Sequence, residues 1–129
     1  MNPPDRKPLY WIASSRKDLK AMPERVRKNV GTALLDVQYG EKPADARPLR
    51  GFGGAGVLEI VDDYQTDTYR AVYTVDFPGA VYVLHAFQKK AKHGIVTPRR
   101  EVDLIRSRYG LARQHHATLR EQGEGEHHG

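Results

Sequence analysis

Basic side chains are concentrated in one stretch of the chain, where they could bind a polyanion. Residues 88–113 carry eight Lys or Arg residues against two acidic ones. Such a composition favours nucleic-acid binding if the fold gathers the charges on one face. For a basic stretch taken alone, the alternative is a solvent-exposed helix and turn. The basic residues are Lys89, Lys90, Lys92, Arg99, Arg100, Arg106, Arg108 and Arg113.

Arg70 is the first candidate for stabilising negative charge, because it is the only Lys or Arg between residues 51 and 80. Alternate side chains of a strand point to opposite faces, so Tyr69, Ala71 and Tyr73 are expected to lie opposite Arg70. The alternative role is an ion pair with Glu59 on the neighbouring strand, since opposite charges commonly pair across strands. The two roles can coexist.

Two histidines, His85 and His93, lie in the part of the chain that we expect to fold. Histidine is the natural acid or base near neutral pH. His85 lies inside an apolar strand, where a hydrogen-bonded core histidine is the alternative, whereas His93 follows the paired lysines in a turn and is freer to act. The chain has no cysteine, and its remaining histidines lie in an expected tail without an ordered surrounding shell, so we expect no metal site.

Length and composition limit the possible fold and location. The chain has 129 residues, of which 39% are hydrophobic and 29% charged, and this suits one domain with one core. No apolar run reaches the roughly 20 residues needed to cross a bilayer. Residues 1–7 are polar and do not resemble a secretory signal, so we expect a cytoplasmic protein with no membrane contact.

The first half of the chain predicts a strand followed by a helical hairpin. The aromatic and β-branched run at residues 8–13 is typical of a strand, and a short helix is expected over residues 16–21. Pro23 begins a second helix, which Gly40 ends. Residues 40–56 are rich in glycine and proline, so we expect a long loop. The second helix has an apolar stripe formed by Met22, Val26, Val30, Leu34 and Val37.

The second half predicts three antiparallel strands and a last helix. The strands are expected over residues 57–61, 68–75 and 80–87, separated by a polar connection and a Pro-Gly turn. The third of these is apolar on both faces, so we expect it to be central and covered on both sides. Thr97 and Pro98 begin a helix whose apolar stripe ends before Gly110.

These elements together indicate an α+β fold in a single domain. Its parts are an N-terminal strand, a two-helix hairpin, a three-stranded antiparallel meander and a C-terminal helix. We expect the domain over residues 8–112, with flexible tails over residues 1–7 and 113–129.

Three short motifs in the chain resemble a known family when they are taken in order. Residues 49–60 form a leucine-led, glycine-rich entry to a strand that contains Glu59, and residues 69–73 hold a tyrosine-arginine pair. Residues 83–90 end in a phenylalanine followed by paired lysines, and Thr97-Pro98 precedes the last helix. Over about residues 8–110 the sequence resembles the RelE/ParE toxin superfamily, and within it the phage-derived HigB-like branch.

The resemblance implies the toxin of a type II toxin-antitoxin system, which cuts translated mRNA on the ribosome and so inhibits translation. Such an endoribonuclease uses no metal and no cofactor. Its expected partners are a cognate antitoxin, a helix-turn-helix protein, together with the ribosome and mRNA, and operator DNA through the antitoxin. Cleavage through the 2′-hydroxyl needs a base, cations for the phosphate oxygens and a donor for the leaving oxygen.

The residue chemistry and the resemblance together give candidate roles for individual residues. The catalytic candidates are Arg70, Lys89, Lys90 and His93. The RNA-binding candidates are Arg50, Lys92, Arg99 and Arg100. We expect Glu59, Tyr73 and His85 to be structural or orienting residues.

The chain departs from the family at one point, and two other functions stay open. Many HigB-like proteins have an arginine soon after the glutamate, whereas Val61, Asp62 and Asp63 follow Ile60 here. One alternative is a ParE-type inhibitor of DNA gyrase, because one fold can carry different functions. The other is a catalytically inactive domain that only binds an antitoxin.

Overall fold

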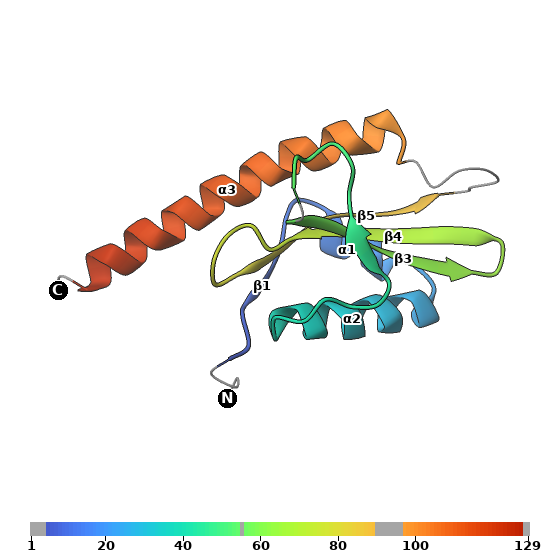
Figure 1. Cartoon of the computed structure of the whole chain (residues 1–129), viewed down its shortest axis with the longest axis horizontal. Helices are drawn as coiled ribbons and strands as arrows, with labels where there is room; N and C mark the ends of the chain where they lie inside the picture. The colour runs from blue at the N-terminus through green and yellow to red at the C-terminus, as the bar shows by residue number, and fades with distance from the viewer. Residues whose placement is uncertain (1–4, 55, 90–96, 128–129) are drawn as a thin grey trace.

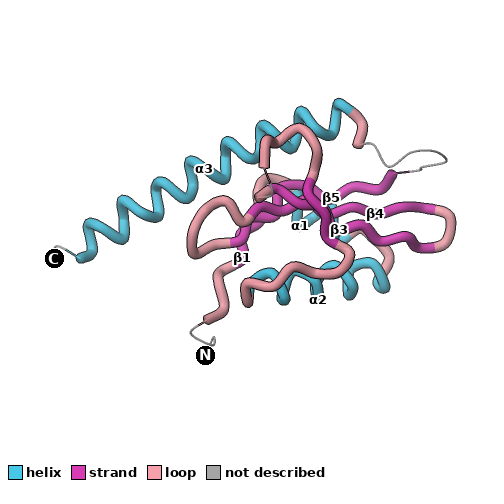
Figure 2. The backbone as a smooth tube through the Cα atoms, in the orientation of Figure 1, coloured by secondary structure: helices cyan, strands magenta, loops and turns pink. Residues whose placement is uncertain are grey.

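Five strands form one mixed sheet with helices on both faces (Figures 1 and 2). The computed structural model describes residues 5–54, 56–89 and 97–127. The strand order is β1-β5-β4-β3-β2, with β1 parallel to β5 and the other neighbours antiparallel. The elements are β1 (Leu9–Trp11), α1 (Ser15–Lys20), α2 (Glu24–Gln38), β2 (Ala46–Pro48), β3 (Val57–Tyr64), β4 (Asp67–Thr74), β5 (Val81–Lys89) and α3 (Arg99–His127). The predicted α+β fold class is confirmed.

The α2 helix packs on the sheet through its predicted apolar stripe. Four residues of this stripe are at most 2% exposed: Val26, Val30, Leu34 and Val37. They share a cluster with Leu58 and Ile60 of β3 and with Tyr73 of β4. Gly40 has a φ of +87°, a conformation that favours glycine, and it follows the end of the helix as predicted.

The α3 helix covers the opposite face of the sheet and is longer than the sequence predicts. Ile105 and Ala112 are fully buried in a cluster with residues of β3, β4 and β5. The helix does not end near Gly110, where its predicted apolar stripe ends, but continues to His127. A glycine in a helix costs only about 1 kcal/mol relative to alanine. The burial of Ala112 and a 2.8 Å hydrogen bond between His115 and Tyr82 hold the following turns against the sheet.

The domain limits given above stay a prediction, but α3 passes residue 112 without a break. Figure 1 shows its last turns extending beyond the sheet toward the C-terminus. The segment expected as a tail from residue 113 is therefore helical as far as His127.

A β-bulge in β5 decides which of its side chains face α3. The pairing with β4 skips Leu84, because Val83 and His85 lie opposite consecutive residues of β4. Val83 packs toward α2, whereas Leu84 packs toward α3 and His85 bonds to α3 residues. An extra residue shifts the alternation of a strand, so Phe87 also packs toward α3. Arg108 of α3 donates a 3.1 Å hydrogen bond to the Leu84 carbonyl.

Two strand predictions need correction. The expected loop at residues 40–56 contains β2, which pairs with β3 at the edge of the sheet. Its Pro48 is compatible with an edge strand, where one N–H is not needed for the ladder. The polar connection after residue 61 is also mostly strand, because β3 and β4 stay paired as far as Tyr64 and Asp67. A two-residue turn joins them, with Gln65 at a φ of +58°.

Candidate anion-binding site

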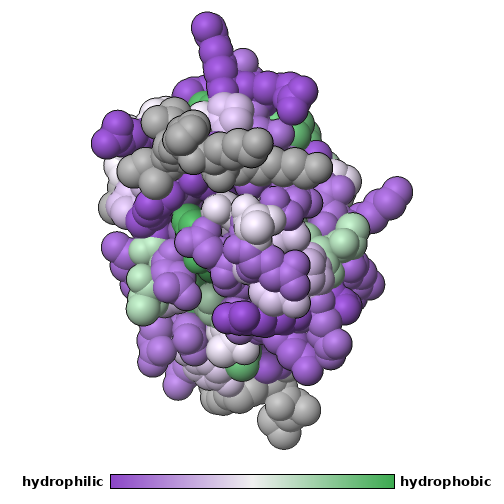
Figure 3. Space-filling model, turned by 90° about the vertical axis from the view of Figure 1, so that its right-hand side faces the viewer, coloured by the Kyte–Doolittle hydropathy of each residue, from purple (hydrophilic) through white to green (hydrophobic). Residues whose placement is uncertain are grey.

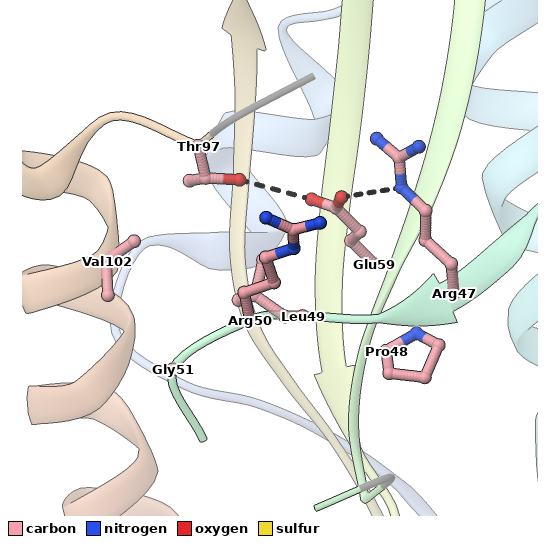
Figure 4. Close-up of a pocket in the computed structure, with 8 residues that line it drawn as sticks. All are labelled: Arg47, Pro48, Leu49, Arg50, Gly51, Glu59, Thr97 and Val102. Carbon is pink, nitrogen blue, oxygen red and sulfur yellow. Dashed lines mark hydrogen bonds and ion pairs between the residues drawn. The ribbon is translucent and has the colours of Figure 1, made fainter. Parts of the chain in front are cut away.

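Glu59 is a buried carboxylate at the centre of a polar cluster (Figure 4). Glu59 is only 3% exposed to solvent. Arg47 donates from Nε to Glu59 Oε1 at 2.9 Å, and Arg70 donates from Nη1 to both carboxylate oxygens at 3.2 and 3.1 Å. Thr97 Oγ1 accepts from Arg70 at 3.1 Å and donates to Glu59 Oε2 at 3.4 Å. Four side chains from distant parts of the sequence are therefore joined in one network.

The sheet register explains how this network assembles. Arg47 of β2 lies directly opposite Glu59 of β3. Arg70 of β4 lies opposite Val61, two residues further along β3 on the same face as Glu59. Thr97 comes just before α3, so the start of that helix completes the cluster. Tyr69, Ala71 and Tyr73 belong to the cluster against α2, as the predicted alternation around Arg70 requires.

The cluster has more positive than negative charge. Glu59 is the acidic member, whereas Arg47 and Arg70 are both bonded to it. Burial, and then the nearby charge of Arg70, lowers the pKa of Lys89 below its usual value. Lys89 therefore belongs to the same electrostatic environment. A surplus of cations around a single carboxylate favours the binding of an anion.

A pocket of about 350 Å³ opens beside the cluster (Figure 4). One wall comes from Arg47 and Glu59 of the sheet, and the loop after β2 supplies Arg50 and Gly51. Val102 of α3 lies on the side toward the helix. Arg50 is exposed and Arg47 is half-buried, so their cationic groups can be reached from solvent. The face of the molecule that lies on the right-hand side of Figure 1 has a mainly hydrophilic surface (Figure 3).

His85 is held in a separate buried network and is 5% exposed. Arg108 Nη1 lies 3.1 Å from His85 Nδ1, and because arginine only donates, this ring nitrogen must accept. The proton of the neutral ring then lies on Nε2, which donates to Glu101. Burial lowers the pKa of His85 despite the opposing effect of Glu101, so the neutral form is favoured near neutral pH. The ring also stacks on Phe87, with 4.9 Å between centroids.

Comparison with known families identifies the chain. A family model described as phage derived protein Gp49-like matches residues 17–110. The chain belongs to the Gp49-like family. This is a RelE-like toxin family, so the predicted membership of the RelE/ParE superfamily is confirmed, whereas the HigB-like branch stays a prediction. No curated protein sequence matches the chain significantly.

Two solved structures are similar to this Gp49-like chain at 20% sequence identity. One is the toxin-antitoxin complex RelBE2 from Mycobacterium tuberculosis, with a TM-score of 0.46 and coverage of 70% of this chain and 100% of that chain. The other is a mutant of the toxin RelE from E. coli in the free state, with a TM-score of 0.44 and coverage of 63% and 81%.

The Gp49-like fold brings some of the predicted site residues together and separates others. Arg70, Glu59 and Arg50 lie in or beside the pocket, and Lys89 lies near Arg70. The structural alternative for Arg70 is observed, because it is 2% exposed and paired with Glu59. Its catalytic role stays a prediction. The predicted residues Lys90, Lys92 and His93 lie outside the described residues.

The remaining predicted residues of the Gp49-like chain lie away from the pocket lining. Tyr73 is buried against α2, and burial raises its pKa to about 12, which suits a structural role. Arg99 and Arg100 are exposed at the start of α3. Arg100 Nη2 approaches Glu101 Oε1 at 3.9 Å.

Sequence analysis did not assign Arg47 or Thr97 to the site. Arg47 lies four residues before Gly51, and its pairing with Glu59 depends on the register of β2 against β3. Thr97 was assigned only to the start of a helix, and its contact with Arg70 depends on the tertiary fold.

Within residues 5–54, 56–89 and 97–127, no three His, Asp or Glu side chains gather as a metal-binding group. Among the helices in those same ranges, none combines the length and apolar character needed to cross a bilayer.

Proposed function

We propose that this chain is the toxin of a type II toxin-antitoxin pair and acts as a ribosome-dependent endoribonuclease that cuts translated mRNA in the cytoplasm. Membership of a RelE-like toxin family supports the toxin assignment. The observation that carries the nuclease assignment is the cationic pocket around Glu59, where Arg47 and Arg50 come from β2 and the loop after it and Arg70 comes from β4.

The chemistry of RNA cleavage explains why such a pocket is suitable. Attack by the 2′-hydroxyl on the neighbouring phosphate builds up negative charge on the phosphate oxygens. Fixed cations that lie where this charge develops lower the barrier. Arg50 and the accessible side of Arg47 would contact the phosphate, and Lys89 would add to the positive potential. Arg70, buried against Glu59, would position that carboxylate and Arg47.

The acid and base of the reaction belong to this proposal as well. His85 is an unsuitable candidate, because both of its ring nitrogens are engaged inside the protein. His93 remains the predicted acid or base, Lys90 remains a predicted catalytic cation, and Lys92 remains a predicted RNA contact. We also propose an antitoxin partner with an acidic segment, because the chain carries a formal charge of +5. Operator DNA would be reached through that antitoxin.

Induced expression in bacteria tests the proposal. Arg50→Ala removes an exposed cation of the pocket, and Arg27→Ala removes another exposed cation from α2 on the other side of the sheet. We expect the wild-type chain and Arg27→Ala to stop growth and to produce new 5′ ends within translated mRNA. We expect Arg50→Ala to lower cleavage at least about tenfold while the protein stays folded by circular dichroism.

The other outcomes of this experiment would contradict the nuclease assignment in different ways. Growth arrest with intact mRNA would support gyrase inhibition, which supercoiling of a reporter plasmid would then reveal. Full expression of a folded chain without growth arrest would support an inactive antitoxin-binding domain. Equal cleavage by the Arg50→Ala and Arg27→Ala variants would remove the pocket from the mechanism.

A further inference from the structure

Arg106 of α3 is fixed against the glycine-rich loop at the edge of the pocket. Its Nη2 donates to the Gly51 carbonyl at 3.2 Å, and its Cζ lies 4.9 Å from the centre of the Phe52 ring. Gly51 itself lines the pocket, as does Val102, one helical turn before Arg106. Gly51 has a φ of +94°, a conformation that favours glycine, so the residue at this position suits the observed geometry of the loop. The guanidinium therefore lies next to the pocket.

The Phe52–Arg106 pair has the properties of a stacking platform. The Phe52 ring is half-buried and packs against the core beneath α3, so its position is held from below. Arg106 lies over this ring but is exposed as a residue. A planar guanidinium held in place by an aromatic ring offers a flat surface on which a nucleobase can stack.

We propose that Phe52 and Arg106 form a nucleobase-stacking site beside the phosphate-binding pocket, so that the site takes a nucleotide of single-stranded RNA. This inference rests on the proposed function, which places a phosphate near Arg50. Arg50 directly precedes Gly51, whose carbonyl accepts from Arg106, so one short loop connects the phosphate-binding group to the base-stacking groups. Bases in a duplex are already stacked on each other, and the site therefore selects an unpaired base.

The same helix provides a matched control for the loss of charge. Arg113 also lies over an aromatic ring, with its Cζ 5.4 Å from the centre of Tyr109. It is exposed and lies about two turns further along α3, where it lines a different surface hollow with Phe77 and Pro78. Arg113→Ala therefore removes one cation and one cation–π contact from α3 without changing the proposed site.

The test uses the full-length protein and short single-stranded RNA probes that are 2′-O-methylated to prevent cleavage. The probes are six nucleotides long. One probe carries all six bases, and each of six others lacks a single base while keeping all the phosphates. Binding is measured by fluorescence anisotropy for the wild type and for the Arg106→Ala, Arg106→Lys, Phe52→Leu and Arg113→Ala variants. Thermal unfolding verifies that each variant is folded.

Stacking of one base predicts a loss of about 5-fold to 150-fold in affinity when the base or its platform is removed. We expect the wild type to lose affinity for one of the probes that lack a base. We expect Arg106→Ala and Arg106→Lys to bind the complete probe as weakly as the wild type binds the sensitive probe that lacks a base. These variants should lose no further affinity when that base is absent. Phe52→Leu should have a smaller effect in the same direction, and Arg113→Ala should resemble the wild type.

Two results would overturn the inference, and they can be distinguished from a failure of the proposed function. If Arg106→Ala weakens all seven probes equally while Arg106→Lys restores binding, Arg106 contacts a phosphate and no base stacks there. If Arg106→Ala and Arg113→Ala behave alike, the pair has no specific role. In both cases binding by the wild type leaves the nuclease proposal intact. Absence of binding by the wild type, together with absence of mRNA cleavage in cells, would reject both.

Discussion

Glu59→Gln removes one negative charge from the buried ion pair and keeps the size of the side chain. Arg70, its partner, is 2% exposed and cannot reach solvent without moving the sheet, whereas 39% of the Arg47 side chain is exposed and can turn outward. The cost of the substitution therefore arises mainly from the charge of Arg70, which loses its carboxylate in a buried position.

The expected loss is about 3–5 kcal/mol of unfolding free energy, the usual cost of removing one partner from a buried ion pair. For a chain of this length such a loss lowers the melting temperature by about 10–20 °C. Glu24→Gln is the control, since Glu24 pairs with Lys28 at the same 3.1 Å distance, but both side chains are more than two thirds exposed. An exposed pair of this kind contributes less than about 0.5 kcal/mol. Urea unfolding at pH 7 measures both variants.

A double variant separates the charge effect from other effects of the substitution. In Glu59→Gln with Arg70→Met, no unpaired charge of that pair remains, and replacement of a whole buried pair by apolar groups is often nearly neutral. We expect the double variant to be at least about 2 kcal/mol more stable than Glu59→Gln alone. A loss below about 1 kcal/mol for Glu59→Gln, or fully additive losses in the double variant, would refute this account of the cluster.

Two further predictions concern His85 and Gly56. Because burial lowers the pKa of His85, the unfolded state binds its proton more readily, and stability should decline as the pH falls below about 6.5. His85→Gln should lose less stability than the wild type between about pH 7.5 and pH 5 in urea unfolding, and equal losses would argue against this assignment. A Cβ at Gly56 would lie 1.4 Å from Asp76 Oδ1, so Gly56→Ala should cost about 1–3 kcal/mol. The cost should be smaller in an Asp76→Ala background, and thermal unfolding of the wild type, the two single variants and the double variant decides this.

Local periodicity in the sequence was sufficient to predict the main elements. The spacing of Val26, Val30, Leu34 and Val37 identified the buried face of α2, because a helix repeats every 3.6 residues whatever it packs against. The apolar run of β5 correctly predicted a strand covered on both faces. Such a strand needs apolar residues at successive positions, because successive side chains point to opposite faces.

The candidate site could be predicted only in part. Arg70 was visible as an isolated cation in an acidic segment, and Glu59 as a charge in an apolar strand, so their pairing was a reasonable alternative from the start. Arg47 could not be placed in the same way. The β2 strand that contains Arg47 has only three residues, too few to show a local pattern. It is a strand because it pairs with β3.

The sequence by itself therefore determined the α+β class, the order of the main elements and the basic character of the chain. Only the tertiary structure decided that Arg47, Arg70 and Thr97 meet at one carboxylate, and that the bulge at Leu84 turns His85 toward α3. The physical reason is the range of the interactions. Helix and strand periodicity act within a few residues, whereas strand register, bulges and buried ion pairs depend on groups far apart in the chain.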